Sequence, residues 1–115
     1  MELRVVRHTT AFDAASSFYG DLLGWPVTRT WDQPTRGRIF GYGDVSRIEL
    51  LEAGAVVDVE GVFIAVEHPD VDALADHLAD HGIEIFQPVA DQPWGHRNVG
   101  VVDPTGLRVV FFQWI

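Results

Sequence analysis

Apolar and polar residues follow two kinds of pattern along the chain, and the whole arrangement occurs twice. Segments that alternate apolar and polar residues or are rich in Val and Ile predict strands at residues 3–8, 27–31, 37–42, 47–51, 62–66, 83–89, 97–102 and 107–115. Apolar residues spaced three and four apart predict a helix over residues 12–23 and another between Asp70 and Gly82. The order of one strand, one helix and three strands is therefore predicted to repeat.

Turn and cap residues separate these elements. Gly24 and Gly82 are typical of helix C-termini, and Pro26 prevents the first helix from continuing. Thr9, Thr10 or Asp13 are candidates to cap the first helix, Asp70 to cap the second, and Asp103-Pro104-Thr105-Gly106 predicts a type I turn. Residues 53–60 are predicted to connect the repeats, with a strand through Val56 and Val57 as the alternative.

The repeat predicts an α+β fold of one domain over residues 1–115, with one module at about 1–54 and the other at about 57–115. One amphipathic helix covers one face of a sheet. Two such βαβββ modules side by side would leave the other faces as a partly open, cup-shaped mixed sheet, which is a natural pocket for a small molecule.

Charge and composition narrow the classes of function. The 115 residues include 8 Lys and Arg against 17 Asp and Glu, a formal net charge of −9, which disfavours nucleic acid and would attract a cationic ligand. The absence of cysteine excludes disulfides and thiolate chemistry. Because no run of apolar residues approaches ~20 and the N-terminus lacks a signal-peptide pattern, we expect a cytoplasmic protein without membrane contact.

Two motifs carry a resemblance to a known family. Phe18-Tyr19-Gly20-Asp21-Leu22-Leu23-Gly24-Trp25 resembles an FY-x-D-x-LG-[FW] signature, and Pro93-Trp94-Gly95-His96-Arg97 followed by Asp103-Pro104-Thr105-Gly106 resembles a PWG-x-R … DP-x-G run. Both are typical of the vicinal oxygen chelate superfamily, which contains glyoxalase I, extradiol dioxygenases and bleomycin-resistance proteins. The resemblance spans nearly all of the chain and implies the cup-shaped glyoxalase/bleomycin-resistance fold.

Metal-dependent members of that superfamily place four ligands on the first, fourth, fifth and eighth strands. The matching residues are Arg4, Glu49, Phe63 and Val110, of which Glu49 alone is a ligand type. The resemblance therefore implies no metal and no cofactor, and we expect Arg4 to pair with Glu49 instead. The alternative is a shifted site that holds a metal through His8, with His96 and Glu49 or Glu67.

The resemblance to the metal-free bleomycin-resistance branch implies a homodimer that sequesters an aromatic or cationic compound such as an antibiotic. The candidate ligand-binding residues are the aromatic, charged and His side chains predicted to face the cup: Arg4, His8, Trp31, Phe40, Tyr42, Glu49, Phe63, Trp94, His96, Arg97, Phe112 and Trp114. No catalytic residue is predicted. Two alternatives are a lyase, isomerase or dioxygenase of the superfamily, and a regulatory or interaction domain whose cup its own side chains fill.

Overall fold

The computed structural model of the protein describes residues 2–56 and 61–115. The chain divides by its internal packing into two units, Met1–Asp58 and Val59–Ile115, and each is described by itself. The predicted connector over residues 53–60, with the alternative strand through Val56 and Val57, lies partly outside the described residues.

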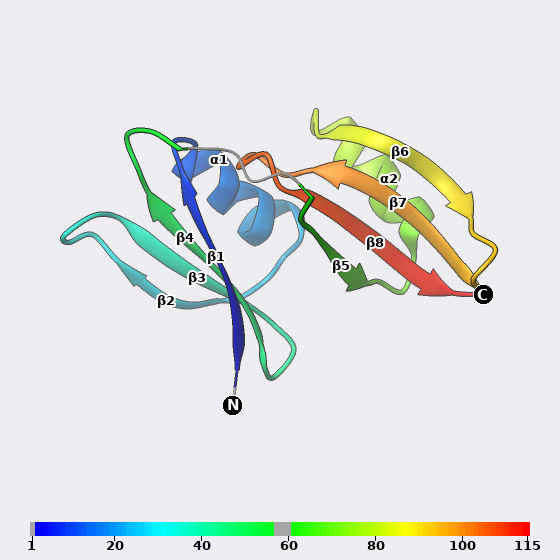
Figure 1. The fold of residues 1–115 in the computed structure, drawn as a ribbon, viewed down its shortest axis with the longest axis horizontal. Helices are drawn as coiled ribbons and strands as arrows, with labels where there is room; N and C mark the ends of the chain where they lie inside the picture. The colour runs from blue at the N-terminus through cyan, green and yellow to red at the C-terminus, as the bar shows by residue number, and fades with distance from the viewer. Residues whose placement is uncertain (1, 57–60) are drawn as a thin grey trace. The chain divides into compact units, whose positions relative to one another are not determined.

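The first unit contains one four-stranded mixed sheet and a helical segment (Figure 1). Its elements are β1 (Leu3–Thr9), α1 (Phe12–Ser16), η1 (Ser17–Leu22), β2 (Val27–Trp31), β3 (Gly37–Tyr42) and β4 (Ser46–Glu52). The strand order is β1-β4-β3-β2, in which β1 runs parallel to β4 and the other pairs are antiparallel.

The second unit repeats this arrangement. Its elements are β5 (Phe63–Glu67), α2 (Val71–Asp80), β6 (Glu84–Asp91), β7 (His96–Val102) and β8 (Arg108–Trp114). The order β5-β8-β7-β6 has the same pattern of one parallel and two antiparallel pairs. The predicted α+β fold with two βαβββ repeats is therefore confirmed.

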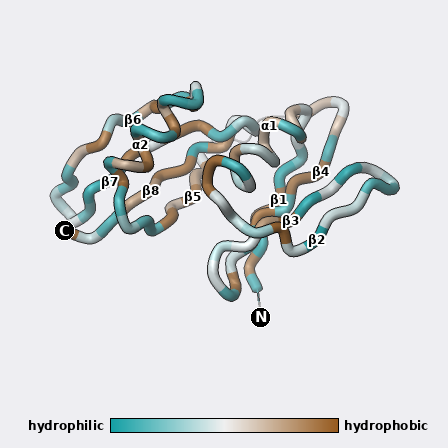
Figure 2. The backbone as a smooth tube through the Cα atoms, turned by 180° about the vertical axis from the view of Figure 1, so that it is seen from behind, coloured by the Kyte–Doolittle hydropathy of each residue, from teal (hydrophilic) through white to brown (hydrophobic). Residues whose placement is uncertain are grey.

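Each sheet buries one face against the helix of its own unit. In the first unit, Phe18 and Tyr19 pack with Phe40, Ile48 and Leu50, all at most 2% exposed. In the second unit, the buried helix residues are Val71, Leu74, Ala75 and Leu78, and the buried strand residues are Val66, Val99, Val101, Val109 and Phe111. Each fully buried side chain of this size contributes about 1.5–3 kcal/mol. Figure 2 shows that apolar residues are frequent along β8 and hydrophilic residues along β2.

The two helices begin and end differently. Asp70 caps α2 as predicted, because its side chain accepts a hydrogen bond from the Ala73 amide at 3.0 Å. The predicted capping of the first helix is wrong: the N-cap residue is Ala11, which has no side chain able to cap, and Thr9 Oγ1 accepts from the Ala11 amide instead.

The first helix also widens along its length. From Ser17 it becomes the π-helical segment η1, in which the Leu23 amide donates to the carbonyl of Phe18, five residues earlier. No helix among the described residues combines the length and the apolar character needed to span a membrane.

Candidate functional site

The alternation of side chains along β7 and β8 separates two faces of the second sheet. Val99 and Val101 of β7 lie on the face that packs against α2. Because neighbouring residues of a strand point to opposite faces, His96 and Asn98 point away from the helix, as do Val110 and Phe112 of β8. We call this the open face of the sheet.

A pocket of about 380 Å³ lies on the open face of the second unit. Its wall is formed by the four strands β5, β6, β7 and β8 and by the turn between β6 and β7. The lining residues are Phe63, Ala65, Gln87, Trp94, His96, Asn98, Val110 and Phe112. The wall thus combines aromatic rings with a His and two amides, and among the described residues it contains no carboxylate. Such a surface suits an organic molecule with an apolar, planar part.

His96 lies at the aromatic end of this pocket. Its ring stacks on Phe112 with the centroids 4.3 Å apart and the planes 14° from parallel. Trp114 meets the same ring edge-on at 4.3 Å, and the indole Nε1 of Trp94 donates a hydrogen bond to His96 Nδ1 at 3.3 Å. His96 Nε2 is buried and has no hydrogen-bond partner among the described residues.

Amide side chains form the polar end of the pocket. Asn98, which is 4% exposed, accepts hydrogen bonds at Oδ1 from Gln87 Nε2 at 3.0 Å and from Gln92 Nε2 at 3.1 Å. Two donors on one oxygen hold the Asn98 carboxamide in a fixed orientation. The sequence analysis did not identify Gln87 or Asn98. Asn98 could have been identified, because alternation along the strand places it on the same face as His96 and on the opposite face from Val99 and Val101.

Arg97 lies on the opposite face from His96. Its guanidinium donates two hydrogen bonds to Asp72 of α2 and one to Asp91 of β6, each at 2.8 Å. The hydrogen bonds from Arg97 lower the pKa of Asp72, and the two carboxylates raise the pKa of Arg97. Arg97 therefore joins the helix to the sheet on the face opposite the pocket, and its role as a ligand contact stays a prediction.

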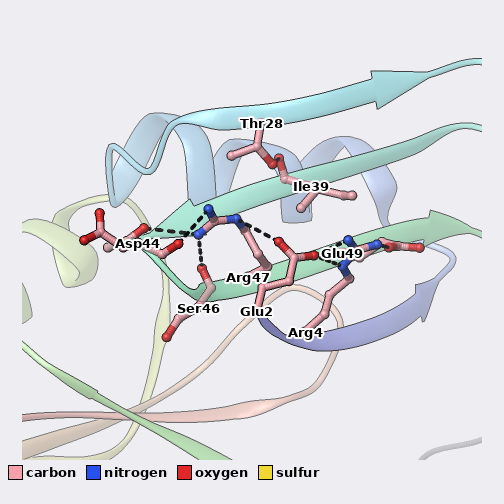
Figure 3. A network of polar contacts seen from close by, with 9 residues as sticks. Glu2, Arg4, Thr28, Ile39, Asp44, Ser46, Arg47 and Glu49 are labelled. Carbon is pink, nitrogen blue, oxygen red and sulfur yellow. Dashed lines mark hydrogen bonds and ion pairs between the residues drawn. The ribbon is translucent and has the colours of Figure 1, made fainter.

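The open face of the first sheet carries a chain of charges (Figure 3). Arg4 donates to Glu49 Oε1 at 2.7 Å and also pairs with Glu2, which in turn lies 3.5 Å from Arg47. The hydrogen bond from Arg4 is the main reason that the pKa of Glu2 is lowered. The expected ion pair between Arg4 and Glu49 is confirmed. It neutralises the Glu49 carboxylate, whose side chain is only 13% exposed.

The other candidates of the first unit are divided between the two faces. Trp31 lies across Gly37 of the neighbouring strand on the open face, and His8 shares that face with Arg4 by alternation along β1. Phe40 is 1% exposed and packs on Tyr19 on the helix-covered face, and its role as a ligand contact stays a prediction. Tyr42 shares the helix-covered face with Phe40, and its ring packs on that of Trp25 with the ring centroids 5.0 Å apart.

The residues at the four expected metal positions do not fit a divalent ion. Arg4 holds Glu49, while Phe63 and Val110 line the pocket and have no donor atom in their side chains. No group of three His, Asp or Glu side chains comes together among residues 2–56 and 61–115. His8 and Glu67 lie in different units, and Glu67 is at the end of β5 opposite Phe112.

Comparison with known proteins assigns the family. Residues 4–111 match the sequence model of the Glyoxalase/Bleomycin resistance protein/Dioxygenase superfamily, and the chain belongs to that superfamily. A comparison with curated protein sequences finds no match.

Solved structures share the fold. TioX from Micromonospora sp. ML1 is 22% identical with a TM-score of 0.79, over 100% of this chain and 99% of that one. TnmS3, described as an antibiotic binding protein from Streptomyces sp. CB03234, is 18% identical with a TM-score of 0.79, over 100% and 96%. The trypanothione-dependent glyoxalase I of Leishmania major is 25% identical with a TM-score of 0.79, over 98% and 86%.

Proposed function

We propose that the protein binds a small organic molecule with a planar aromatic part, without a metal ion, in the pocket on the open face of the second unit. The observation that carries this proposal is the pocket itself. Its volume of about 380 Å³ falls in the range of small-molecule sites, and its wall combines Phe63, Trp94 and Phe112 with a few polar groups.

Metal independence is supported by the residues at the positions where relatives hold an ion. Arg4 supplies a positive charge next to Glu49, and that charge replaces the neutralising role of a cation. Antibiotic sequestration is a specific form of the proposal. It is supported by the shared fold of TnmS3, an antibiotic binding protein.

Binding is tested with 2-acetylnaphthalene, 2-isopropylnaphthalene and 2-(aminomethyl)naphthalene by titration calorimetry and saturation-transfer NMR. We expect the first two compounds to bind to the wild-type protein. Val110→Trp places an indole ring in the pocket and should abolish their binding, because Val110 lies on the pocket wall.

Val45→Trp is the matched control, since Val45 is 52% exposed in the turn before β4 of the first unit. Its binding should equal that of the wild type. Failure of all three compounds to bind, or unchanged binding by a folded Val110→Trp protein, would overturn the proposal.

A further inference from the structure

The protonation pattern of His96 is fixed by its neighbour. The indole nitrogen of Trp94 can only donate a hydrogen bond, and its N–H points at His96 Nδ1 at 3.3 Å. Nδ1 is therefore the acceptor nitrogen of the imidazole. The proton of the ring is then on Nε2, which makes Nε2 a hydrogen-bond donor.

This donor has no acceptor within the described residues. Nε2 of His96 is buried, and it makes no hydrogen bond to any of them. A buried N–H without an acceptor costs free energy. A ligand oxygen that accepts from it therefore gains more binding free energy than it would from the same hydrogen bond to an exposed group. The position of this atom in a pocket-lining residue makes the bound molecule the natural source of that acceptor.

The surrounding rings determine how the molecule must be placed. Phe112 covers one face of the imidazole, and Trp114 packs against it while remaining 65% exposed. Because Trp114 is largely surrounded by solvent, its ring can turn aside with little loss of packing. A planar ring that replaces it would keep an aromatic contact and bring an oxygen atom to Nε2.

The described lining of the pocket offers an organic cation no carboxylate to pair with. Its polar lining, within residues 2–56 and 61–115, consists of His96, Gln87 and Asn98 and includes no Asp or Glu. A cation could contact the ring faces and the amide oxygens, but it would leave Nε2–H without an acceptor. The net charge of −9 attracts cations at long range, but this local surface does not pair with one.

Building on the proposed binding function, we infer that His96 Nε2–H is the specificity-determining donor of the pocket and selects neutral or anionic planar molecules that carry an oxygen acceptor. Trp94 acts as a positioning residue, because it acts through the imidazole by holding the tautomer. The acceptor is a carbonyl, carboxylate or phenolate oxygen attached to the ring system.

The test compares two probes of nearly equal shape in two proteins. 2-Acetylnaphthalene offers a carbonyl oxygen where 2-isopropylnaphthalene offers a methyl group, and His96→Phe keeps an aromatic ring on Phe112 while removing the N–H. We expect the ratio of the two affinities to shift by about fivefold against 2-acetylnaphthalene in His96→Phe, as for the loss of one hydrogen bond. 2-(Aminomethyl)naphthalene, as the cation, should bind most weakly to the wild type.

His81→Phe is the control for this substitution, because His81 is exposed at the C-terminal end of α2, the helix that covers the other face of the sheet. Its affinity ratio should be that of the wild type. If both probes bind and Val110→Trp blocks them but the ratio does not change in His96→Phe, the selectivity inference fails while the binding function stands. If no probe binds, both fail.

The role of Trp94 has its own readout. In ¹⁵N NMR spectra of the wild-type protein recorded at pH 8.5, His96 should show the Nε2–H tautomer. Trp94→Phe keeps a ring at the position but removes the donor, and the ¹⁵N shifts of His96 should move toward values averaged over both tautomers. A wild-type His96 protonated on Nδ1 would overturn the inference.

Discussion

At the residue scale, the Glu49 carboxylate depends on Arg4 for its neutralising partner. The Glu49 side chain is 13% exposed, and Arg4 donates to it at 2.7 Å. Arg4→Met would leave a largely buried carboxylate without its partner, which is costly, whereas replacing both charges removes that cost. We therefore expect Arg4→Met to lower the midpoint of urea unfolding, and Arg4→Met combined with Glu49→Met to recover most of the loss.

The control for this cycle is Glu2→Gln, which removes another charge that contacts Arg4. Glu2 is 37% exposed in its side chain, so its substitution should lower the midpoint less than Arg4→Met does. An Arg4→Met protein as stable as the wild type would show that Glu49 is solvated without its partner.

The pairing of Arg4 with Glu49 could be predicted from the sequence because the family motifs place both residues on the same face of adjacent strands. The placement of Phe40 could not. A two-residue period shows that Phe40 and Tyr42 share a face, but it does not tell which face the helix covers. That choice depends on packing with Tyr19, which lies far from Phe40 in the sequence.

At the scale of elements, Arg97 fixes α2 to the strands beneath it. Its hydrogen bonds to Asp72 lower the pKa of that carboxyl group. A carboxyl whose pKa is lowered by folding contributes stability that is fully present above its ordinary pKa of about 3.9 and is lost as the pH falls through the lowered value.

We therefore expect Asp72→Asn to unfold at lower urea concentration than the wild type at pH 7, and the difference to shrink as the pH falls below about 4. Urea unfolding at pH 7, 5, 4 and 3 measures this. Asp76→Asn, on an exposed position of the same helix, controls for loss of a negative charge. A difference that stays constant from pH 7 to pH 3 would contradict the assignment.

Element order and most strand positions could be predicted from hydrophobic periodicity, because each sheet has one buried face. The widening of the first helix at η1 could not, since one turn of π-helix changes the apolar spacing too little to be seen. The contact that accompanies it is specific: a Cβ on Gly20 would lie 3.0 Å from the Phe40 ring, so the missing side chain allows close approach.

At the scale of the whole molecule, the proposal of metal independence predicts how the protein responds to ions. An ion bound only to the folded state at a hundred times its Kd would stabilise the protein by about 2.7 kcal/mol. We expect the midpoint of thermal unfolding to be the same with Ni²⁺, Zn²⁺, Mn²⁺, Fe²⁺ or Co²⁺ as with EDTA. A rise that Glu49→Gln or His8→Ala abolishes would instead establish a metal site.

Superfamily membership and the repeated fold could both be predicted from the two motifs. The ligand could not, because superfamily members share a scaffold and differ in the side chains on the open faces. The homodimer and the cytoplasmic location remain predictions. The pocket of the second unit could not be predicted either, because it depends on the strand pairing that places Gln87 of β6 within hydrogen-bond distance of Asn98 of β7.

Both sheets contain a glycine that supports an aromatic ring from the neighbouring strand. A Cβ on Gly37 would lie 2.1 Å from the Trp31 ring, and a Cβ on Gly100 would lie 2.5 Å from the Phe86 ring. Any larger residue at either glycine must lift that ring away from its sheet, on the face that the helix leaves uncovered. A single substitution at either glycine would thus change the shape of the open face, whereas the hydrophobic core lies on the opposite face.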